Sequence, residues 1–557
     1  MKTEGRARRA LRRGIGSALV CACLAGAGSA QSQPLDRAAI DAVFADYDKP
    51  GVPGCMLGVM RAGEVVYARG YGRASLEHDI SFTTRTVFDI GSTSKQIVAT
   101  AIVLLAQDGA LALDDDVRKH LPEMPDYGTP ITIRHLLTHT SGLRDYITLM
   151  SLGGWQMEDV TTPAQALDVV RRQKGLDFTP DTEFAYSNSG FFLASVIVER
   201  ASGKPLGTFA RERIFLPLGM TSTRYMDDHA AVVPGRATGY EPADGGSFRV
   251  SLSNWEQLGD GAVQTSIDDL ASWDANFYAP TLGGRSLIDA LTTVHRLKTG
   301  VPTTYGLGLF VDEHRGLPTV RHGGSWAGYR AELLRFPVER TSIAVLCNRG
   351  DANPEARADK VAHLVLKDRF LKPAPAEAEA PAPADTKALA KFAGVYWSDE
   401  RMQALRLRAG EQGLAVVTGR ELQPLADTGE GTYGVPLFGL RLRFVDGPRR
   451  SVERLGRNGV ATTLEAGEEW SPDTATLDQY AGTWVSEELQ ARWVIARDGD
   501  ALVVKDLRAT PRRWTPAVRH VFTSGGFVLK FIATDGTPRE MLVGAGRARG
   551  MRFVREP

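Results

Sequence analysis

The chain has 557 residues, too many for a single domain, so its length predicts a protein of several domains. Its 66 basic and 66 acidic residues leave no net charge, and no basic stripe is present, which argues against nucleic acid as a partner. A hydrophobic content of 43% with 24% charged residues is typical of a soluble globular protein.

The first thirty residues have the pattern of a secretory signal peptide. A basic lead ends at Arg13, the short apolar stretch 15–27 follows, and small residues precede Gln31. We expect cleavage after Ala30 and a periplasmic or secreted mature protein. A membrane anchor is the weaker alternative because the apolar stretch is too short to span a bilayer, and no later segment reaches that length. Twin-arginine export and lipoprotein attachment fit their motifs poorly.

Cys55 and Cys347 are the cysteines left after the signal peptide, and both lie in apolar runs with strand character. Two buried thiols are the simplest expectation, and a disulfide is the alternative in an exported protein. The two cysteines are far apart in sequence and the histidines are scattered, so no metal-ligand spacing appears. We expect no metal and no other cofactor.

Residues 34–371 have the pattern of one α/β domain. Helix patterns begin near Ser92 and fill the middle of this segment, together with many loops. Strand patterns lie at its two ends, at 55–60, 64–69, 317–321, 329–336 and 342–347, before a last helix at 354–369. Strands at both ends predict one antiparallel sheet flanked by helices, with a helical region inserted between its two halves.

The rest of the chain contains a linker and an internal repeat. Residues 373–386 alternate Pro, Ala and Glu, which predicts a stiff exposed linker. The sequence LAKFAGVYWSDE, which starts at Leu389, returns as LDQYAGTWVSEE 88 residues later, at Leu477. Both copies continue with alternating strand patterns and Asp-Gly turns, so we expect two antiparallel, lipocalin-like β-barrel domains at 387–473 and 474–557. Neither copy contains a nucleophile–base pattern, and their default role is structural.

The first chemical pattern is Ser92, which stands three residues before Lys95 at the start of an apolar helix. This spacing places the hydroxyl and the amine on one helix face, one turn apart. A serine hydroxyl is a weak nucleophile at neutral pH, and a neighbouring amine that is kept neutral can activate it. The free N–H groups of the helix start can also stabilise negative charge. Alone, Ser-x-x-Lys arises by chance in long chains, and the alternative is an N-cap serine beside a solvated lysine.

Tyr186 and Asn188 form the second pattern, in a loop before another apolar helix. A positive charge beside a phenol favours the phenolate, so we expect Tyr186 to take the Ser92 proton and return it to the leaving group. Asn188 can donate and accept hydrogen bonds with a substrate amide. An isolated Tyr-x-Asn is more often ordinary loop chemistry.

The third pattern is His322-Gly323-Gly324-Ser325, which follows a predicted strand. We expect the two glycines to let a substrate backbone approach closely. The Ser325 N–H is expected to join the Ser92 N–H in an oxyanion hole. As a lone motif, His-Gly-Gly is usually a turn.

Together these patterns resemble the β-lactamase and penicillin-binding-protein superfamily, in its class C-like branch. The likeness covers about residues 34–371 and includes the runs 135–143 and 259–270. It implies that Ser92 is the acylated nucleophile, with Lys95 and Tyr186 as the general-base pair. It also implies that Asn188 orients the substrate and that the strand carrying His322, Gly323 and Gly324 edges the site.

One position departs from the commonest pattern of that superfamily. Many β-lactamases carry Lys-Thr-Gly where this chain has His322-Gly323-Gly324. A lysine offers a fixed positive charge to a substrate carboxylate, whereas a histidine near its ordinary pKa is mostly neutral at pH 7. The His-x-Gly variant is similar to that of D-aminopeptidases and esterases, and the D-aminopeptidase also carries two barrels. There, a loop of the last barrel enters the site and favours substrates with a free N-terminus; residues 506–514 are one candidate for such a loop here.

The leading hypothesis is an exported serine hydrolase that forms an acyl-enzyme on Ser92 and cleaves amide or ester bonds. Small peptides that contain D-amino acids are the favoured substrates. The alternative activities are those of an esterase or a β-lactamase of the same superfamily. A Ser-His-Asp α/β-hydrolase requires Gly-x-Ser-x-Gly, and the segment Gly323 to Ala327 fails at its last position. A slowly deacylating penicillin-binding sensor protein, with the barrels as interaction modules, is a hypothesis of a different class.

Overall fold

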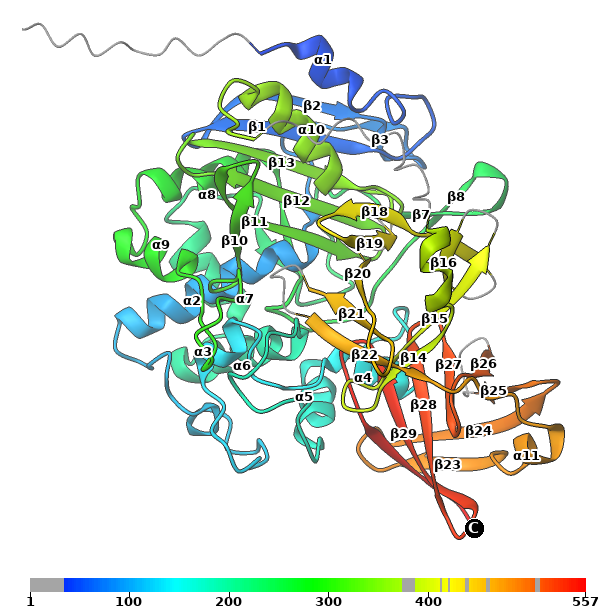
Figure 1. The fold of residues 1–557 in the computed structure, drawn as a ribbon. Helices are drawn as coiled ribbons and strands as arrows, with labels where there is room; N and C mark the ends of the chain where they lie inside the picture. The colour runs from blue at the N-terminus through cyan, green and yellow to red at the C-terminus, as the bar shows by residue number, and fades with distance from the viewer. Residues whose placement is uncertain are drawn as a thin grey trace, which may run out of the picture.

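The computed structural model describes residues 35–372, 386–410, 413–418, 421–435, 440–456, 461–505 and 511–557 (Figure 1). The expected signal peptide (1–30) and all but the last residue of the expected linker (373–386) lie outside these ranges. Within these ranges, none of the helices combines the length and the apolar character needed to cross a membrane.

A six-stranded antiparallel sheet forms the centre of the N-terminal domain, and it is built from both ends of the domain's sequence, as expected. Its strands in spatial order are β10 (Phe310–His314), β11 (Leu317–Trp326), β12 (Tyr329–Phe336), β13 (Thr341–Cys347), β1 (Cys55–Arg61) and β2 (Glu64–Tyr71). The pairing of β1 with β13 joins the first strands of the domain to its last ones.

Different helices cover the two faces of this sheet, because side chains alternate along each strand. Leu57 and Val59 of β1 point into a cluster shared with α1 (Arg37–Ala42) and α10 (Pro354–Leu366). Met56 and Met60 point the other way, into the larger core that contains the inserted helices. Figure 1 shows α10 against the sheet on one side and α2 on the other.

The inserted region is mainly helical, as the sequence predicts. Its helices are α2 (Lys95–Gln107), α3 (Ile133–Leu137), α4 (Tyr146–Leu152), α5 (Pro163–Arg171), α6 (Asn188–Ser202), α7 (Leu206–Ala210), α8 (Ile267–Tyr278) and α9 (Gly284–Thr292), with the short helices η1 (Gly91–Ser94), η2 (Val117–Lys119), η3 (Arg211–Phe215) and η4 (Asp244–Gly246). The short strands around them are β3 (Arg73–Ser75), β4 (Ile80–Ser81), β5 (Phe88–Asp89), β6 (Arg224–Tyr225), β7 (Tyr240–Pro242), β8 (Phe248–Val250) and β9 (Val263–Thr265). Local sequence sets several helix starts: the side-chain oxygens of Thr162 and Ser266 cap α5 and α8.

Cys55 and Cys347 form a disulfide that joins β1 to β13. The expectation of two buried thiols is therefore wrong, and the alternative holds. The two residues are separated by 292 positions in sequence but lie directly opposite each other in the sheet. Only the strand pairing brings them together.

The first barrel-like sheet is nearly closed and follows the short helix η5 (Lys387–Phe392). Its strands in spatial order are β17 (Glu421–Pro424), β16 (Gly413–Thr418), β15 (Gln403–Gly410), β14 (Gly394–Ser398), β22 (Ala461–Gly467), β21 (Ser451–Leu455), β20 (Leu440–Val445), β19 (Thr432–Val435) and β18 (Ala426–Gly429). Its interior holds a hydrophobic cluster of its own, which includes Tyr396, Leu407 and Leu442.

The second barrel is closed and follows α11 (Thr474–Asp478). Its strands are β23 (Gly482–Ser486), β24 (Ala491–Asp498), β25 (Ala501–Lys505), β26 (Arg512–Pro516), β27 (Val521–Ser524), β28 (Phe527–Thr534), β29 (Thr537–Ala545) and β30 (Met551–Arg555).

The sequence repeat is also a structural repeat. Strands β14 and β23 begin 88 residues apart, and so do β15 and β24. In the first copy Tyr396 Oη donates to the carbonyl of Phe392 (3.0 Å), and in the second Trp484 Nε1 donates to that of Tyr480 (3.2 Å). The prediction of two antiparallel barrels in tandem is confirmed.

Candidate active site

Ser92 lies in η1, a short 3-10 helix that continues directly into α2. All α2 residues from Lys95 to Leu105 are buried, which is the pattern of a helix inside a core. The Ser92 hydroxyl is therefore held at the end of a rigid central helix, as the sequence predicts.

The Lys95 side chain is buried and points back to Ser92. Its Nζ lies 3.0 Å from Ser92 Oγ, 2.9 Å from Asn188 Oδ1 and 2.6 Å from the backbone oxygen of Asp260. The last two atoms are acceptors only, so a neutral amine donates one hydrogen to each and turns its lone pair to the Ser92 hydroxyl. This is the geometry of a base beside its nucleophile.

The electrostatic surroundings favour that neutral amine. Burial lowers the pKa of Lys95 to about 7, against the attraction of the Asp260 carboxylate, and the Arg547 cation lowers it further. Burial therefore favours the free base of Lys95 more than it would at an exposed lysine. Burial in turn raises the pKa of Asp260, whose carboxylate accepts a hydrogen bond from Tyr146 Oη (3.1 Å).

Tyr186 lies beside this pair. Its hydroxyl shares a hydrogen bond with Ser92, and Lys95 Nζ lies 4.9 Å from the centre of its ring. Burial raises the pKa of Tyr186 and outweighs the lowering effect of that hydrogen bond. The expected phenolate is therefore wrong for this structure, because a buried phenol keeps its proton near neutrality.

Asn188, the first residue of α6, holds the lysine through its side-chain oxygen. Its backbone N–H donates to Asp145 Oδ2 (2.7 Å), and Asp145 also caps α4. One buried carboxylate thus fixes two helix starts at the site. The expected role of Asn188 in orienting a substrate stays a prediction.

His322-Gly323-Gly324-Ser325 belongs to β11, which continues to Trp326 instead of ending at the predicted residue 321. The His322 ring is buried and its Nε2 forms a hydrogen bond with Tyr305 Oη (2.9 Å). This contact fixes the ring against the core behind the strand.

Gly324 is needed for a close approach within the chain itself, which differs from the expected approach of a substrate. A Cβ on Gly324 would lie 1.8 Å from the backbone oxygen of Ile90, just before η1. A Cβ on Gly91 would lie 2.7 Å from the backbone nitrogen of Ser325. The end of β11 therefore packs directly on the turn that carries Ser92. The oxyanion hole of the Ser92 and Ser325 N–H groups stays a prediction.

The structure adds residues that the sequence patterns did not single out. His139, inside the family-like run 135–143, contacts Tyr186 with the two rings tilted and 4.1 Å between their centres, and its Nδ1 accepts a hydrogen bond from Ser187 N (3.2 Å). Burial lowers its pKa well below the usual value, so it is neutral. Asp260 lies in the run 259–270. Both runs marked the neighbourhood, but no spacing rule assigned these residues a role.

Arg547 also reaches the site, from the turn between β29 and β30 of the second barrel. Its guanidinium carbon lies 4.7 Å from the centre of the Tyr186 ring. Part of the loop suggested for such an approach, residues 506–510 of 506–514, lies outside the described residues. The turn 546–550 carries no catalytic motif, so sequence spacing gave no signal for it.

One cavity of about 2100 Å³ connects these groups. Most of the predicted site residues line it: Ser92, Tyr186, Asn188, His322, Gly323 and Ser325. Lys95 and Gly324 lie behind this wall. Both barrels contribute to the rest of the lining, including Arg454 from the first and Arg547 from the second.

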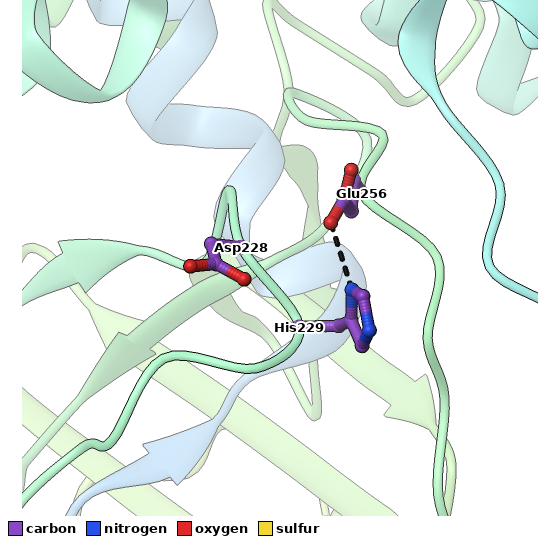
Figure 2. Close-up of side chains that lie close together, drawn as sticks. All are labelled: Asp228, His229 and Glu256. Carbon is purple, nitrogen blue, oxygen red and sulfur yellow. Dashed lines mark hydrogen bonds and ion pairs between the residues drawn. The ribbon is translucent and has the colours of Figure 1, made fainter.

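A group of possible metal ligands lies at the edge of the cavity, which His229 lines. Asp228, His229 and Glu256 place one ligand atom each within 4.8 Å of one another, and Figure 2 shows His229 facing Glu256. His229 Nδ1 and Glu256 Oε1 are 2.8 Å apart and share a hydrogen bond, and Asp228 Oδ1 accepts one from Ala230 N (2.9 Å). Sequence reasoning missed the group because Glu256 lies 27 residues after His229.

The Beta-lactamase family model matches residues 40–367, more than half of the chain. The chain is also 31% identical to a D-aminopeptidase of Cereibacter sphaeroides (strain ATCC 17029 / ATH 2.4.9) over 462 residues, which cover 81% of this chain and 83% of that protein. A relative of a second kind, penicillin-binding protein 4* of Bacillus subtilis (strain 168), is 29% identical over 66% of this chain and 85% of its own length.

Solved structures share the fold. An octameric penicillin-binding protein homologue from Pyrococcus abyssi aligns over 94% of this chain and 100% of its own, with a TM-score of 0.54 and 20% identity. D-amino acid amidase from Ochrobactrum anthropi SV3, complexed with D-phenylalanine, aligns over 60% of this chain and 99% of its own, with a TM-score of 0.51 and 23% identity. The chain therefore belongs to the beta-lactamase family and is a serine hydrolase of that superfamily.

Proposed function

We propose that this chain is an exported hydrolase that forms an acyl-enzyme on Ser92 and cleaves amide bonds in peptides that contain D-amino acids. The observation that carries the proposal is the buried Lys95 amine, 3.0 Å from Ser92 Oγ with a pKa near 7. A base of that pKa is well matched to proton transfer at neutral pH.

The proposed chemistry starts at Lys95. Its amine takes the Ser92 proton while Oγ bonds to the substrate carbonyl carbon, and the N–H groups of Ser92 and Ser325 receive the oxyanion. The C–N bond then breaks, and Tyr186, which still holds its proton, gives it to the leaving nitrogen and is reprotonated from Lys95. Water cleaves the resulting ester by the same steps in reverse order, which frees the acid and restores Ser92.

The substrate class comes from two kinds of support. The relative named D-aminopeptidase matches 81% of the chain, and the amidase structure shares the catalytic fold. Export is supported by the expected signal peptide and by the disulfide between Cys55 and Cys347, since disulfides persist in oxidising compartments. N-terminal sequencing of the mature protein from a periplasmic fraction tests cleavage after Ala30.

The catalytic assignment is tested with D-alanyl p-nitroanilide as substrate. We expect Ser92→Ala to abolish turnover, and Lys95→Ala and Tyr186→Phe each to lower the acylation rate by roughly 10³-fold or more. The double variant should lose little more than either single variant, because the two groups act as one unit. Undiminished turnover by a folded Ser92→Ala variant would rule out the mechanism.

A penicillin-binding sensor is the second candidate, supported by the penicillin-binding relatives in sequence and fold. Intact-protein mass spectrometry after exposure to a β-lactam distinguishes the two candidates. An adduct on Ser92 that lasts for hours favours the sensor, whereas rapid release or no adduct, together with turnover of the anilide, favours the hydrolase.

A further inference from the structure

The turn 546–550 is built so that it presents one side chain at its tip. Gly546 and Gly550 have φ angles of 55° and 64°, in the left-handed region that glycine adopts easily. The backbone groups of Ala545, just before the turn, and Ala548, within it, exchange hydrogen bonds of 2.8 and 3.2 Å, which closes the turn. Arg547 is therefore carried at a tight and well-defined corner between β29 and β30.

The turn is attached to the catalytic domain at its tip and two residues after it. The backbone oxygen of Arg547 accepts from Asp145 N (3.0 Å), the residue that also holds Asn188. The backbone nitrogen of Arg549 donates to Asp177 Oδ1 (2.8 Å). The backbone that carries Arg547 is thus held directly beside the catalytic groups.

The charge of Arg547 is not balanced by a carboxylate. In the described part of the chain, no ion pair or side-chain hydrogen bond joins Arg547 to another residue, and its close contact is the Tyr186 ring. Arg549, by contrast, lies 3.8 Å from Glu183. The nearby buried carboxylates already have partners: Asp145 accepts from Asn188 N and Thr148, and Asp260 accepts from Tyr146.

The Arg547 cation also lies on the leaving-group side of the scissile bond in the proposed mechanism. In the proposed mechanism Tyr186 protonates the leaving nitrogen, so a group held over the Tyr186 ring lies next to the leaving group. The positive charge of Arg547 lowers the pKa of both Lys95 and Tyr186, so its electrostatic effect reaches the groups that transfer protons in the proposed mechanism. A free ammonium in this position would be repelled, and a carboxylate would be attracted.

We propose that Arg547 is a specificity-determining residue that binds a carboxylate on the leaving-group side of the scissile amide. The inference rests on the proposed function and narrows its substrate class to peptides whose leaving group is an amino acid with a free carboxylate. The positive charge that His322 does not supply on β11 is thus provided by the second barrel.

A matched pair of substrates tests the proposal: D-alanyl-D-alanine, and D-alanyl-D-alaninamide cleaved at the same peptide bond. We expect the full-length wild type to prefer the carboxylate in kcat/KM. Arg547→Gln should lower the ratio of the two kcat/KM values by roughly 10- to 100-fold, the range for a hydrogen bond to a charged group. Arg547→Glu should lower this ratio further, and Arg547→Lys should keep part of it.

The control is Arg552→Gln, which removes an exposed charge on the adjoining strand β30, where Arg552 pairs with Glu540 (2.5 Å). It should leave the ratio unchanged. Equal ratios in wild type and Arg547→Gln, or an equal loss on both substrates, would overturn the role of Arg547. Activity that survives in Ser92→Ala would instead overturn the proposed function, so the two failures are distinguishable. Thermal unfolding of each variant checks that it is folded.

Discussion

The two barrels share a sequence repeat, but they pack against the catalytic domain in different ways. The buried residues of the second barrel, such as Trp484 and Phe531, belong to the same hydrophobic cluster as α2 and α6. Those of the first barrel, such as Tyr396, form a separate cluster. The second barrel is therefore part of the catalytic core, whereas the first is packed beside it.

One pair of equivalent residues shows the same difference, although Arg401 of the first barrel also pairs with Glu183 of the catalytic domain. Glu488 of the second barrel forms an ion pair with Arg144 at 2.9 Å, and each side chain is only 8% exposed. The equivalent residue of the first barrel, Glu400, is 79% exposed and lies 3.8 Å from Arg401 of its own barrel. The comparison teaches that a repeated sequence can keep its fold while only one copy joins its hydrophobic core to that of the catalytic domain.

The largest expected effect comes from replacing one large buried side chain in each barrel with alanine, at equivalent positions of the repeat. Trp484→Ala should lower the free energy of unfolding by about 3–5 kcal/mol and should also reduce kcat/KM, because its cluster continues into the catalytic core. Tyr396→Ala should destabilise the first barrel by a similar amount and leave kcat/KM of the folded enzyme near the wild-type value. Denaturant unfolding and steady-state kinetics measure both, and equal losses of activity would contradict the comparison.

The next effect concerns the buried ion pair. Glu488→Gln leaves Arg144 without its closest carboxylate and should cost about 3 kcal/mol of stability. Glu400→Gln, at the matching place in the first barrel, should cost under about 1 kcal/mol, since exposed pairs contribute little. Thermal unfolding of the wild type and the two variants measures these losses of stability. Similar costs would show that the two barrels are docked alike.

The smallest effect is on pH dependence. Because the pKa of Lys95 is lowered to about 7, kcat/KM should rise with pH up to that value and then level off. Removing the Arg547 cation favours the ammonium form of Lys95, so Arg547→Gln should move the midpoint to higher pH by a fraction of a unit. Arg454→Gln, which removes a cavity cation of the first barrel, should leave it in place. A shift to lower pH in Arg547→Gln, or the same shift in both variants, would contradict the predicted effect of the Arg547 charge on Lys95.

Much of the fold was readable from local patterns. Strand alternation at both ends of residues 34–371 predicted the sheet of the catalytic domain, and the repeat at Leu389 and Leu477 predicted the barrels. These features depend on periodicity and turns that lie close together in sequence. The pairing of Cys55 with Cys347 could not be read in the same way, because it depends on which strands become neighbours.

For the site, the sequence by itself determined that Ser92 and Lys95 face each other, since one helical turn separates them. Only the tertiary structure decided the pKa shifts: burial, which no spacing encodes, raises the pKa of Tyr186 and lowers that of Lys95. Only the docking of the second barrel brought Arg547 over Tyr186 from 361 positions away. Packing between residues far apart in sequence sets both the burial of a charged group and its neighbours. The pKa shifts and the Arg547 contact therefore depend on the tertiary structure.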